Sequence, residues 1–372
     1  MHAGDLDERG VPTAAELRRI ARKIVRDCAG VKAGENVYIE GRADSFDYLE
    51  LLALECELVG AQPLVVAQSD EHRWRRLDEL PPEQLASRGD HWLAAVKAAD
   101  VVLTVRLEDG QPALFRDVPA SQLGADRRGR KVLSDYIYDG TRRWIGTDYP
   151  TPEQAAAFRV DWREFASTFW RALDVDYRLL QERADCICAV LDGAEQVRIR
   201  SPKGTDVTLR IGGRPLDKDV GVVTPHAVFS NLPAGEVCLA PLEDGANGRV
   251  IFDLNFWDGV RIEDLEVRFA AGHCEPIAAK TGLQTFIDTV TSATGGGDVI
   301  GELGIGLNPE VVTPTGYMLT DEKILGTIHI ALGDNRMLGG VNESSLHWDL
   351  LVMNATLEAD GRPILRDGTL AL

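Results

Sequence analysis

The chain has 372 residues, with 40 Lys and Arg against 59 Asp and Glu, which gives a formal net charge of −19 at pH 7. This length predicts two domains, and the composition, 44% hydrophobic and 27% charged, is that of a globular protein. The acidic surplus argues against nucleic acid or an anionic membrane as partners, because both attract positive charge. The polar first residues lack the apolar core of a signal peptide, and no apolar run approaches the roughly 18 residues of a membrane span. We therefore expect a cytoplasmic protein.

The first half of the chain alternates helix and strand patterns. Apolar residues recur at helical spacing over Ala14–Cys28, and Thr13 with Glu16 forms a capping-box pattern ahead of them. Three strands are expected next, at 35–41, 63–67 and 99–105. A second helix is expected between the first two strands, at Asp47–Val59. Helices between short apolar strands predict parallel pairing, so residues 1–190 should form an open doubly wound α/β domain, similar to Rossmann or flavodoxin folds. No GxGxxG or GxxxxGK(S/T) motif follows these strands, so nothing here predicts a nucleotide.

The pattern changes near residues 185–195, where two-residue alternation begins. Apolar and polar residues alternate on both sides of Pro202-Lys203-Gly204, which predicts a β-hairpin. Strand-like runs then dominate, at 236–241, 248–255, 265–272, 324–333 and 346–359, with one helix expected at Leu283–Ala293. We expect residues 191–372 to form a second, α+β domain rich in antiparallel strands.

Six cysteines are spread along the chain without the spacing of a disulfide framework. Only Cys186 and Cys188 stand close together, and on a strand they would share one face. Their spacing is poor for a zinc knuckle and favours a buried structural pair.

Two histidines in the second half point to a metal. In His347-Trp348-Asp349 the imidazole and the carboxylate stand two residues apart, so on a strand they project from one face, and they suit zinc, cobalt, manganese or ferrous iron. His329 lies inside the apolar run 324–333, where an ionisable group needs a partner. The Gly-rich stretch DNRMLGG separates the two histidines, so their strands could pair as a hairpin. Each histidine alone is also explained by an ordinary structural hydrogen bond.

Two glutamates extend this set. Glu236 follows Pro-Ala-Gly at the head of a strand-like run, and Glu302 lies in the glycine-rich stretch GELGIG. Flanking glycines let a backbone approach an ion closely, although each glutamate alone could be an exposed turn residue. The full set is of the right size for a mononuclear or dinuclear metal site; its members are Glu236, Glu302, His329, His347 and Asp349.

Five sequence blocks resemble the aminopeptidase T family of metallopeptidases, leucyl aminopeptidases of the M29 type. The blocks are SPKGTDVTLRIGGR, NLPAGEV, GELGIGLNP, EKILGTIHIALG and GGVNESSLHWD, in matching order over roughly residues 15–360. The resemblance implies a two-domain subunit, a cytoplasmic homodimer and a dinuclear site in the second domain. It also implies five metal ligands, which map onto Glu236, Glu302, His329, His347 and Asp349.

One residue departs from the family pattern. The family carries a tyrosine ligand between the two histidines, whereas residues 330–346 hold no tyrosine and Tyr317 lies upstream. Ring-cleaving 2,5-dihydroxypyridine dioxygenases resemble the same scaffold and hold one ferrous ion with two histidines and an aspartate. His347 and Asp349 match that pattern, but Glu302 stands where the third ligand, a histidine, is expected. With the other ligands retained, the chain is nearer the hydrolase pattern.

The leading hypothesis is metal-dependent hydrolysis of an N-terminal amide bond in a small peptide. Such a site would hold one or two divalent ions (Zn, Co or Mn). Two ions about 3.5–4 Å apart would lower the pKa of a bridging water and polarise the scissile carbonyl. We expect Glu302 to bridge the ions and Glu236 to act in catalysis by carrying the proton. Arg336, in the loop between the histidines, is the candidate for binding a substrate carboxylate, unless it is a solvated loop residue.

Two alternatives belong to other function classes. One is a mononuclear Fe(II) ring-cleaving dioxygenase, and the other is a non-catalytic protein that binds a small molecule on the same scaffold. Elemental analysis distinguishes them, because two zinc, cobalt or manganese ions favour the hydrolase and one iron favours the oxygenase.

Overall fold

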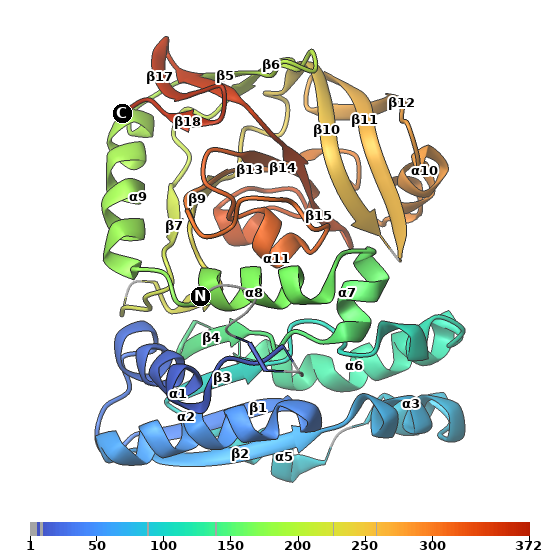
Figure 1. Ribbon diagram of the computed structural model, residues 1–372. Coiled ribbons are helices and arrows are strands. Elements are labelled where there is room, and N and C mark those ends of the chain that lie inside the picture. Colours follow the sequence, from blue (N-terminus) through green and yellow to red (C-terminus); the bar gives the residue numbers. More distant parts are fainter. Residues whose placement is uncertain (1–5, 8–9, 88, 138–139, 226, 258) are drawn as a thin grey trace. The chain divides into compact units, whose positions relative to one another are not determined.

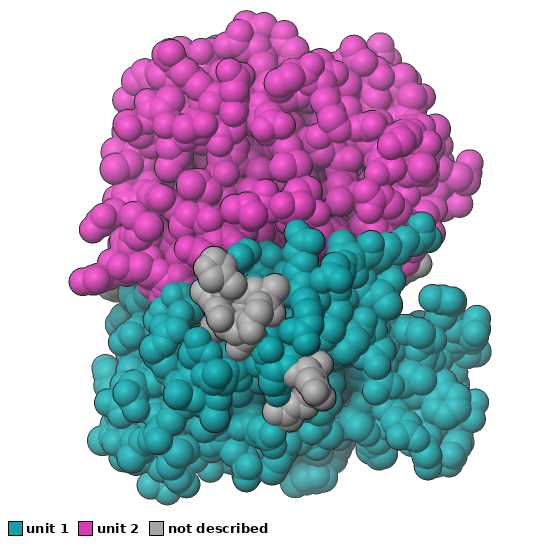
Figure 2. Space-filling view, viewed as in Figure 1, with its two compact units in different colours: residues 1–174, 221–232 teal, residues 175–220, 233–372 magenta. Residues whose placement is uncertain are grey.

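The computed structural model describes residues 6–7, 10–87, 89–137, 140–225, 227–257 and 259–372. The chain forms two compact units, drawn in Figure 1 and coloured separately in Figure 2: Met1–Asp174 with Gly221–Leu232, and Val175–Val220 with Pro233–Leu372. We predicted a boundary at residue 190. The contacts instead place helix α9 (Tyr177–Leu191) in the second unit, because it packs on strands of that unit, β9 and β17. The segment 221–232 returns to the first unit.

The first unit is built on a parallel sheet, as the sequence predicts. Its strand order is β2-β1-β3-β4-β8, and every neighbouring pair is parallel. The strands are β1 (Asn36–Arg42), β2 (Gln62–Gln68), β3 (Val101–Val105), β4 (Arg143–Thr147) and β8 (Phe229–Asn231). The helices are α1 (Ala14–Lys23), α2 (Phe46–Val59), α3 (Asp70–Glu79), α4 (Pro82–Leu85), α5 (Asp90–Lys97), α6 (Ala120–Ile137), α7 (Pro152–Phe158) and α8 (Trp162–Leu173), with shorter turns at Ile24–Cys28, Ala43–Ser45 and Pro112–Phe115.

The predicted start of helix α1 and the predicted end of helix α2 are confirmed. The Thr13 side chain accepts from the Glu16 backbone, and the Glu16 carboxylate accepts from the Thr13 backbone, so the capping box is formed. The apolar stripe buries Leu17 and Ile20 in the core. Helix α2 ends at Gly60, whose φ of 91° lies in the left-handed region that only glycine adopts without strain.

The second unit contains two antiparallel sheets. The larger has the order β12-β11-β10-β6-β5-β16-β17-β18, and the smaller has the order β15-β14-β13-β9-β7. The strands are β5 (Gln196–Arg200), β6 (Asp206–Arg210), β7 (Asp217–Asp219), β9 (Glu236–Leu239), β10 (Asn247–Trp257), β11 (Val260–Ala270), β12 (His273–Ala278), β13 (Ile300–Gly306), β14 (Ile328–Gly333), β15 (His347–Val352), β16 (Thr356–Ala359), β17 (Arg362–Arg366) and β18 (Thr369–Leu370). Besides α9, its helices are α10 (Leu283–Ser292) and α11 (Met318–Asp321), with a 3-10 turn at Arg336–Leu338.

The predicted hairpin is the β5–β6 pair, but two expectations for this unit are wrong. The run 346–359 is not one strand, because Asn354 has a φ of 51° and the chain passes there from the small sheet into the large one. Cys186 and Cys188 lie on α9, where Cys186 is exposed and Cys188 half-buried, so they are not a buried pair. Helix α9 extends to Leu191, into the region 185–195 where the sequence predicts the change to strand alternation.

No helix among the described residues is long and apolar enough to cross a membrane.

Candidate metal centre

The small sheet of the second unit carries all five predicted metal-ligating residues. Glu236 begins β9, Glu302 lies on β13, His329 on β14, and His347 and Asp349 on β15. Strands β14 and β15 pair antiparallel, so the predicted hairpin relation of the two histidine strands is confirmed. The histidines are not opposite each other, since His329 pairs with Leu351 and His347 with Gly333.

Small residues make room for these side chains on one face of the sheet. Ala331 of β14 pairs with Glu302 on one side and with Asp349 on the other, so the two carboxylates flank a single methyl group. Gly304 lies beside His329, and a Cβ at residue 304 would stand 2.0 Å from the Nε2 atom of that imidazole. Any side chain at position 304 would therefore displace the imidazole.

Glu302 lies between the two imidazoles. Its Oε1 is 3.3 Å from His329 Nε2, and its Oε2 is 3.3 Å from His347 Nε2. Asp349 adds a carboxylate oxygen 3.6 Å from His347 Nε2, and Glu236 adds one 3.4 Å from His329 Nε2. The structure thus brings the five side chains, from four strands, into one cluster.

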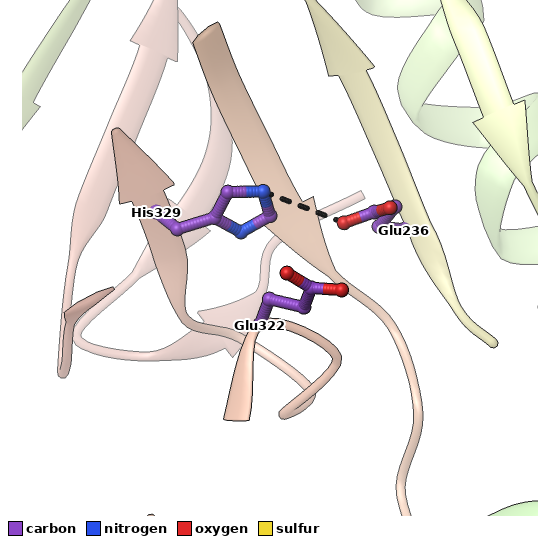
Figure 3. A group of neighbouring side chains, drawn as sticks. All are labelled: Glu236, Glu322 and His329. Carbon is purple, nitrogen blue, oxygen red and sulfur yellow. Dashed lines mark ion pairs between the residues drawn. The ribbon is translucent and has the colours of Figure 1, made fainter. Parts of the chain in front are cut away.

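Two further residues of this cluster were missed by the sequence reasoning. Glu322, directly after α11, approaches Glu236 and His329 closely enough for one ion to touch all three, as Figure 3 shows. Lys323, fully buried, places Nζ 2.5 Å from Glu236 Oε1 and 2.9 Å from Glu322 Oε1. Both residues stand in the block EKILGTIHIALG, but they follow a short helix in a loop where no periodicity indicates burial.

The backbone holds the imidazole of His347 in a defined direction. Its Nδ1 lies 2.7 Å from the carbonyl oxygen of Asp334, so a proton on Nδ1 donates to that oxygen and leaves Nε2 facing Glu302 and Asp349. Metal-bound histidines are oriented in this way by a partner of the second ring nitrogen. The His347 side chain is 40% exposed, whereas His329 is 1% exposed, so the cluster opens to solvent on the His347 side.

The donor atoms fit a divalent cation. Glu236 Oε2 and Asp349 Oδ1 are buried and have no hydrogen-bond partner among the described residues. Two overlapping groups bring donor atoms within 4.8 Å of one another: Glu236, Glu322 and His329 form one, and Glu302, His329 and Asp349 form the other. Buried carboxylate oxygens without donors, next to imidazole nitrogens, are the arrangement that zinc, cobalt or manganese satisfies.

The local charges shift the pKa values in opposite directions. Burial acts to raise the pKa of Glu302, but the hydrogen bonds from both imidazoles outweigh it and hold that pKa well below its usual range. Burial raises the pKa of Glu236 to about 8, against the attraction of Lys323. Burial acts to lower the histidine pKa values, yet the surrounding carboxylates raise that of His329 to about 9 and that of His347 to about 12. The cluster therefore has a strongly negative potential.

Arg336 and Tyr317 each contact residues outside the two donor groups. Arg336 is half-exposed in the turn after β14, where its guanidinium pairs with Asp334 and Glu343. Its partner Asp334 is the residue whose carbonyl oxygen orients His347. Tyr317 is buried at the start of α11, and its backbone N–H donates to Thr315 Oγ1.

A family model, described as thermophilic metalloprotease (M29), matches residues 13–370. The chain belongs to this family. The match confirms the predicted resemblance and makes the chain a metallo-aminopeptidase-like hydrolase. Aminopeptidase AmpS of Bacillus subtilis is 20% identical, over 96% of this chain and 98% of the relative. Aminopeptidase 2 of Geobacillus stearothermophilus is 22% identical with the same coverage.

Two solved structures share the fold of this member of the M29 family. AmpT from Thermus thermophilus has a TM-score of 0.79 at 20% identity, over 96% of this chain and 99% of that one. The 2,5-dihydroxypyridine dioxygenase of Pseudomonas putida KT2440 has a TM-score of 0.62 at 16% identity, over 96% and 97%. The fold alone therefore does not distinguish an aminopeptidase from a dioxygenase, and the distinction has to come from the side chains of the cluster.

Proposed function

We propose that this chain is a metal-dependent aminopeptidase that removes the N-terminal residue of small peptides. One observation carries the proposal: four carboxylates and two imidazoles converge on a face of the small sheet that glycine and alanine keep open. Membership of the M29 family and the two aminopeptidase relatives support the same chemistry.

The cluster divides into two candidate ion positions. Glu236, Glu322 and His329 would hold one divalent ion, and His347 and Asp349 the other, with Glu302 between the two because its oxygens face different imidazoles. Glu322 adds an oxygen donor to the first of these groups. Such ions acidify a bound water and polarise a carbonyl oxygen.

The carboxylates of the cluster favour a free amino terminus. Four carboxylates lie together in the cluster, beside the ammonium group of Lys323. Carboxylate oxygens bind ammonium groups through short, charge-assisted hydrogen bonds. An α-ammonium group at the head of a peptide would therefore be held near the open side at His347, which places the first amide bond beside the donors.

Two other roles follow from side-chain positions. Glu236 Oε2 is the candidate proton carrier, because Lys323 occupies the other oxygen and Oε2 has no hydrogen-bond partner among the described residues. Arg336 is the candidate for binding a substrate carboxylate, since its loop also orients His347.

The donor set favours hydrolysis over oxygenation. A mononuclear iron oxygenase site needs two histidines and one carboxylate and keeps its other positions open. Here three further carboxylates surround the same imidazoles, and two of them, Glu236 and Glu322, form a second group of donors around His329. We therefore propose two ions of zinc, cobalt or manganese, bound in a cytoplasmic homodimer, rather than one ferrous ion.

The deciding experiment combines metal analysis with substrate choice. Anaerobically purified protein should contain two zinc, cobalt or manganese ions per chain and should cleave leucine p-nitroanilide, with loss of activity in EDTA. N-acetyl-leucine p-nitroanilide, which lacks the ammonium group, should be cleaved at least a hundredfold more slowly. One iron per chain with oxygen-dependent turnover of a dihydroxypyridine would instead establish the dioxygenase, and absence of metal under all conditions would favour a non-catalytic binding protein.

A further inference from the structure

A small cavity of the first unit lies at the carboxyl ends of three parallel strands. Its volume is about 30 Å³. The lining residues are Glu40 of β1, Gln68 of β2, Arg73 and Arg76 of α3, Trp92 of α5, Arg106 directly after β3, and Arg130 and Leu133 of α6. In the order β2-β1-β3 the chain changes direction at β1, and ligands of open α/β sheets bind at the carboxyl ends of strands at such a point.

The walls of this cavity are strongly basic. Four arginines and one carboxylate, that of Glu40, line it. The aspartates that pair with these arginines, which are Asp70, Asp109 and Asp126, are not among the lining residues. Asp126, fully buried, contacts Arg73 Nε at 3.2 Å and Arg130 Nε at 3.3 Å.

Helical spacing produces this arrangement. Arg73 and Arg76 stand three residues apart on α3, so they share one face, whereas Arg75 points away and pairs with Glu71 in solvent. Asp126 and Arg130 stand four apart on α6 and also share a face. The two helices contact each other, as Figure 1 shows for this part of the first unit.

The arginines keep hydrogen-bond donors beyond their ion pairs. Arg130 reaches Asp126 with Nε, Arg76 reaches it with Nη1 at 3.6 Å, and Arg106 reaches Asp70 with Nη2 at 3.0 Å. Since a guanidinium has five N–H donors in a planar fork, each of these three retains N–H groups for an oxyanion. Burial, as the largest cause, and the nearby Arg73 guanidinium lower the pKa of Arg130 from its ordinary 12.5 to about 10, against the attraction of Asp126 and Asp109.

We propose that this cavity binds a small oxyanion of the phosphate class, either free phosphate or the phosphoryl group of a small metabolite. The volume holds roughly two water molecules, which suits a single tetrahedral anion rather than a nucleic acid or an acidic protein segment. The net charge of −19 repels polyanions over the rest of the surface, so the cavity selects small ligands. No step of the proposed hydrolysis uses this cavity.

Isothermal titration of the full, metal-loaded chain with inorganic phosphate and with methyl phosphate, at constant ionic strength, tests the proposal. Arg130→Gln should weaken binding by about tenfold to a hundredfold, because it removes charged donors. Arg75→Gln, on α3 but outside the cavity, is the matched control and should change the affinity less than twofold.

The outcomes separate the possible sources of the signal. Stronger binding of methyl phosphate identifies a phosphorylated metabolite as the ligand class, and stronger binding of inorganic phosphate identifies the free ion. Phosphate bound at the metal centre would not depend on Arg130. The proposal is therefore overturned if Arg130→Gln binds phosphate as tightly as the unchanged chain does, or if neither probe binds at 20 mM. If Arg130→Gln does not fold, Arg76→Gln takes its place in the experiment.

Discussion

Buried carboxylates are compensated differently in the two units of this protein. In the first unit, the side chain of Glu55 is fully buried and accepts hydrogen bonds from Arg18 and Arg22 of α1. Asp126 is equally buried and faces Arg73 and Arg130. Because arginine stays protonated at every relevant pH, these carboxylates carry permanent counter-charges and are structural.

In the second unit, the buried carboxylates of the candidate metal centre face one another, whereas Asp321 accepts hydrogen bonds from the backbone of Thr315 and Gly316. Glu236, Glu302 and Glu322 lie within one cluster, and Lys323 is its permanent cation among the described residues. The other positive partners are imidazoles, whose charge depends on protonation. Burial alone therefore does not indicate function. A cluster of buried carboxylates indicates a cation site where the protein supplies too few fixed positive charges and hydrogen-bond donors.

The largest effect is expected for Glu302→Gln. Because the carboxylate lies between both imidazoles, its loss should lower leucine p-nitroanilide hydrolysis on the order of 10³-fold and reduce the bound metal, while the circular dichroism spectrum stays unchanged. Glu275→Gln, which removes an exposed carboxylate of the same unit, is the control and should keep full activity. Normal metal content and hydrolysis in Glu302→Gln would contradict the assignment of this site.

Lys323→Met should destabilise the metal-free protein by about 3–5 kcal/mol, because it leaves buried carboxylates without their ammonium partner. Calorimetric melting temperatures with and without Mn²⁺ provide the measurement. The gain on adding the ion should be larger in Lys323→Met than in the unchanged chain, since the ion then supplies the missing charge. The exposed Lys280→Met should show neither effect. An equal or smaller gain would mean that Lys323 does not balance the cation site.

Glu55→Gln tests the arginine-compensated carboxylates of the first unit. Burial acts to raise the pKa of Glu55, but hydrogen bonds from Arg22 and Arg18 outweigh it and hold the pKa below 4.5. A lowered folded-state pKa gives stability that is fully present above pH 4.5 and disappears as the pH falls through the folded value. Glu55→Gln should therefore cost about 1–2 kcal/mol at pH 7 and less at pH 3.

Thermal unfolding of this variant from pH 7 to pH 3 gives the measurement, with the exposed Glu57→Gln of the same helix as control. Divalent ions should not rescue Glu55→Gln, in contrast to Lys323→Met. A cost that stays constant with pH would show that the guanidinium pairing is not its cause.

The smallest effect is expected for Arg336→Gln. Its guanidinium is half-exposed and already paired with Asp334, so loss of a substrate carboxylate contact should raise KM by about 3–10-fold and leave kcat unchanged. The comparison uses a tripeptide and its C-terminal amide, since the amide should show no difference between the variant and the unchanged chain. An equal change for both substrates would assign Arg336 a structural role, and the exposed Arg268→Gln should change neither.

Local patterns in the sequence predicted the secondary structure and the ligand candidates. The capping box at Thr13, the end of the second helix at Val59 and the two-residue alternation around residues 197–211 need only neighbouring residues to be recognised. The i, i+2 relation of His347 and Asp349 is likewise a property of one strand, and the strand pairing follows from the short connection to β14. These features depend on short-range geometry, which a sequence displays directly.

Only the tertiary structure decided which charged side chains are buried together. Glu322 and Lys323 enter the cluster because α11 ends against the small sheet, and α9 joins the second unit because its buried face meets β9. The basic cavity arises where three helices and the ends of three strands converge. The sequence shows which side chains are charged. The neighbours that compensate each charge are set by strand register and helix packing between residues far apart in the chain, and no local periodicity predicts these contacts.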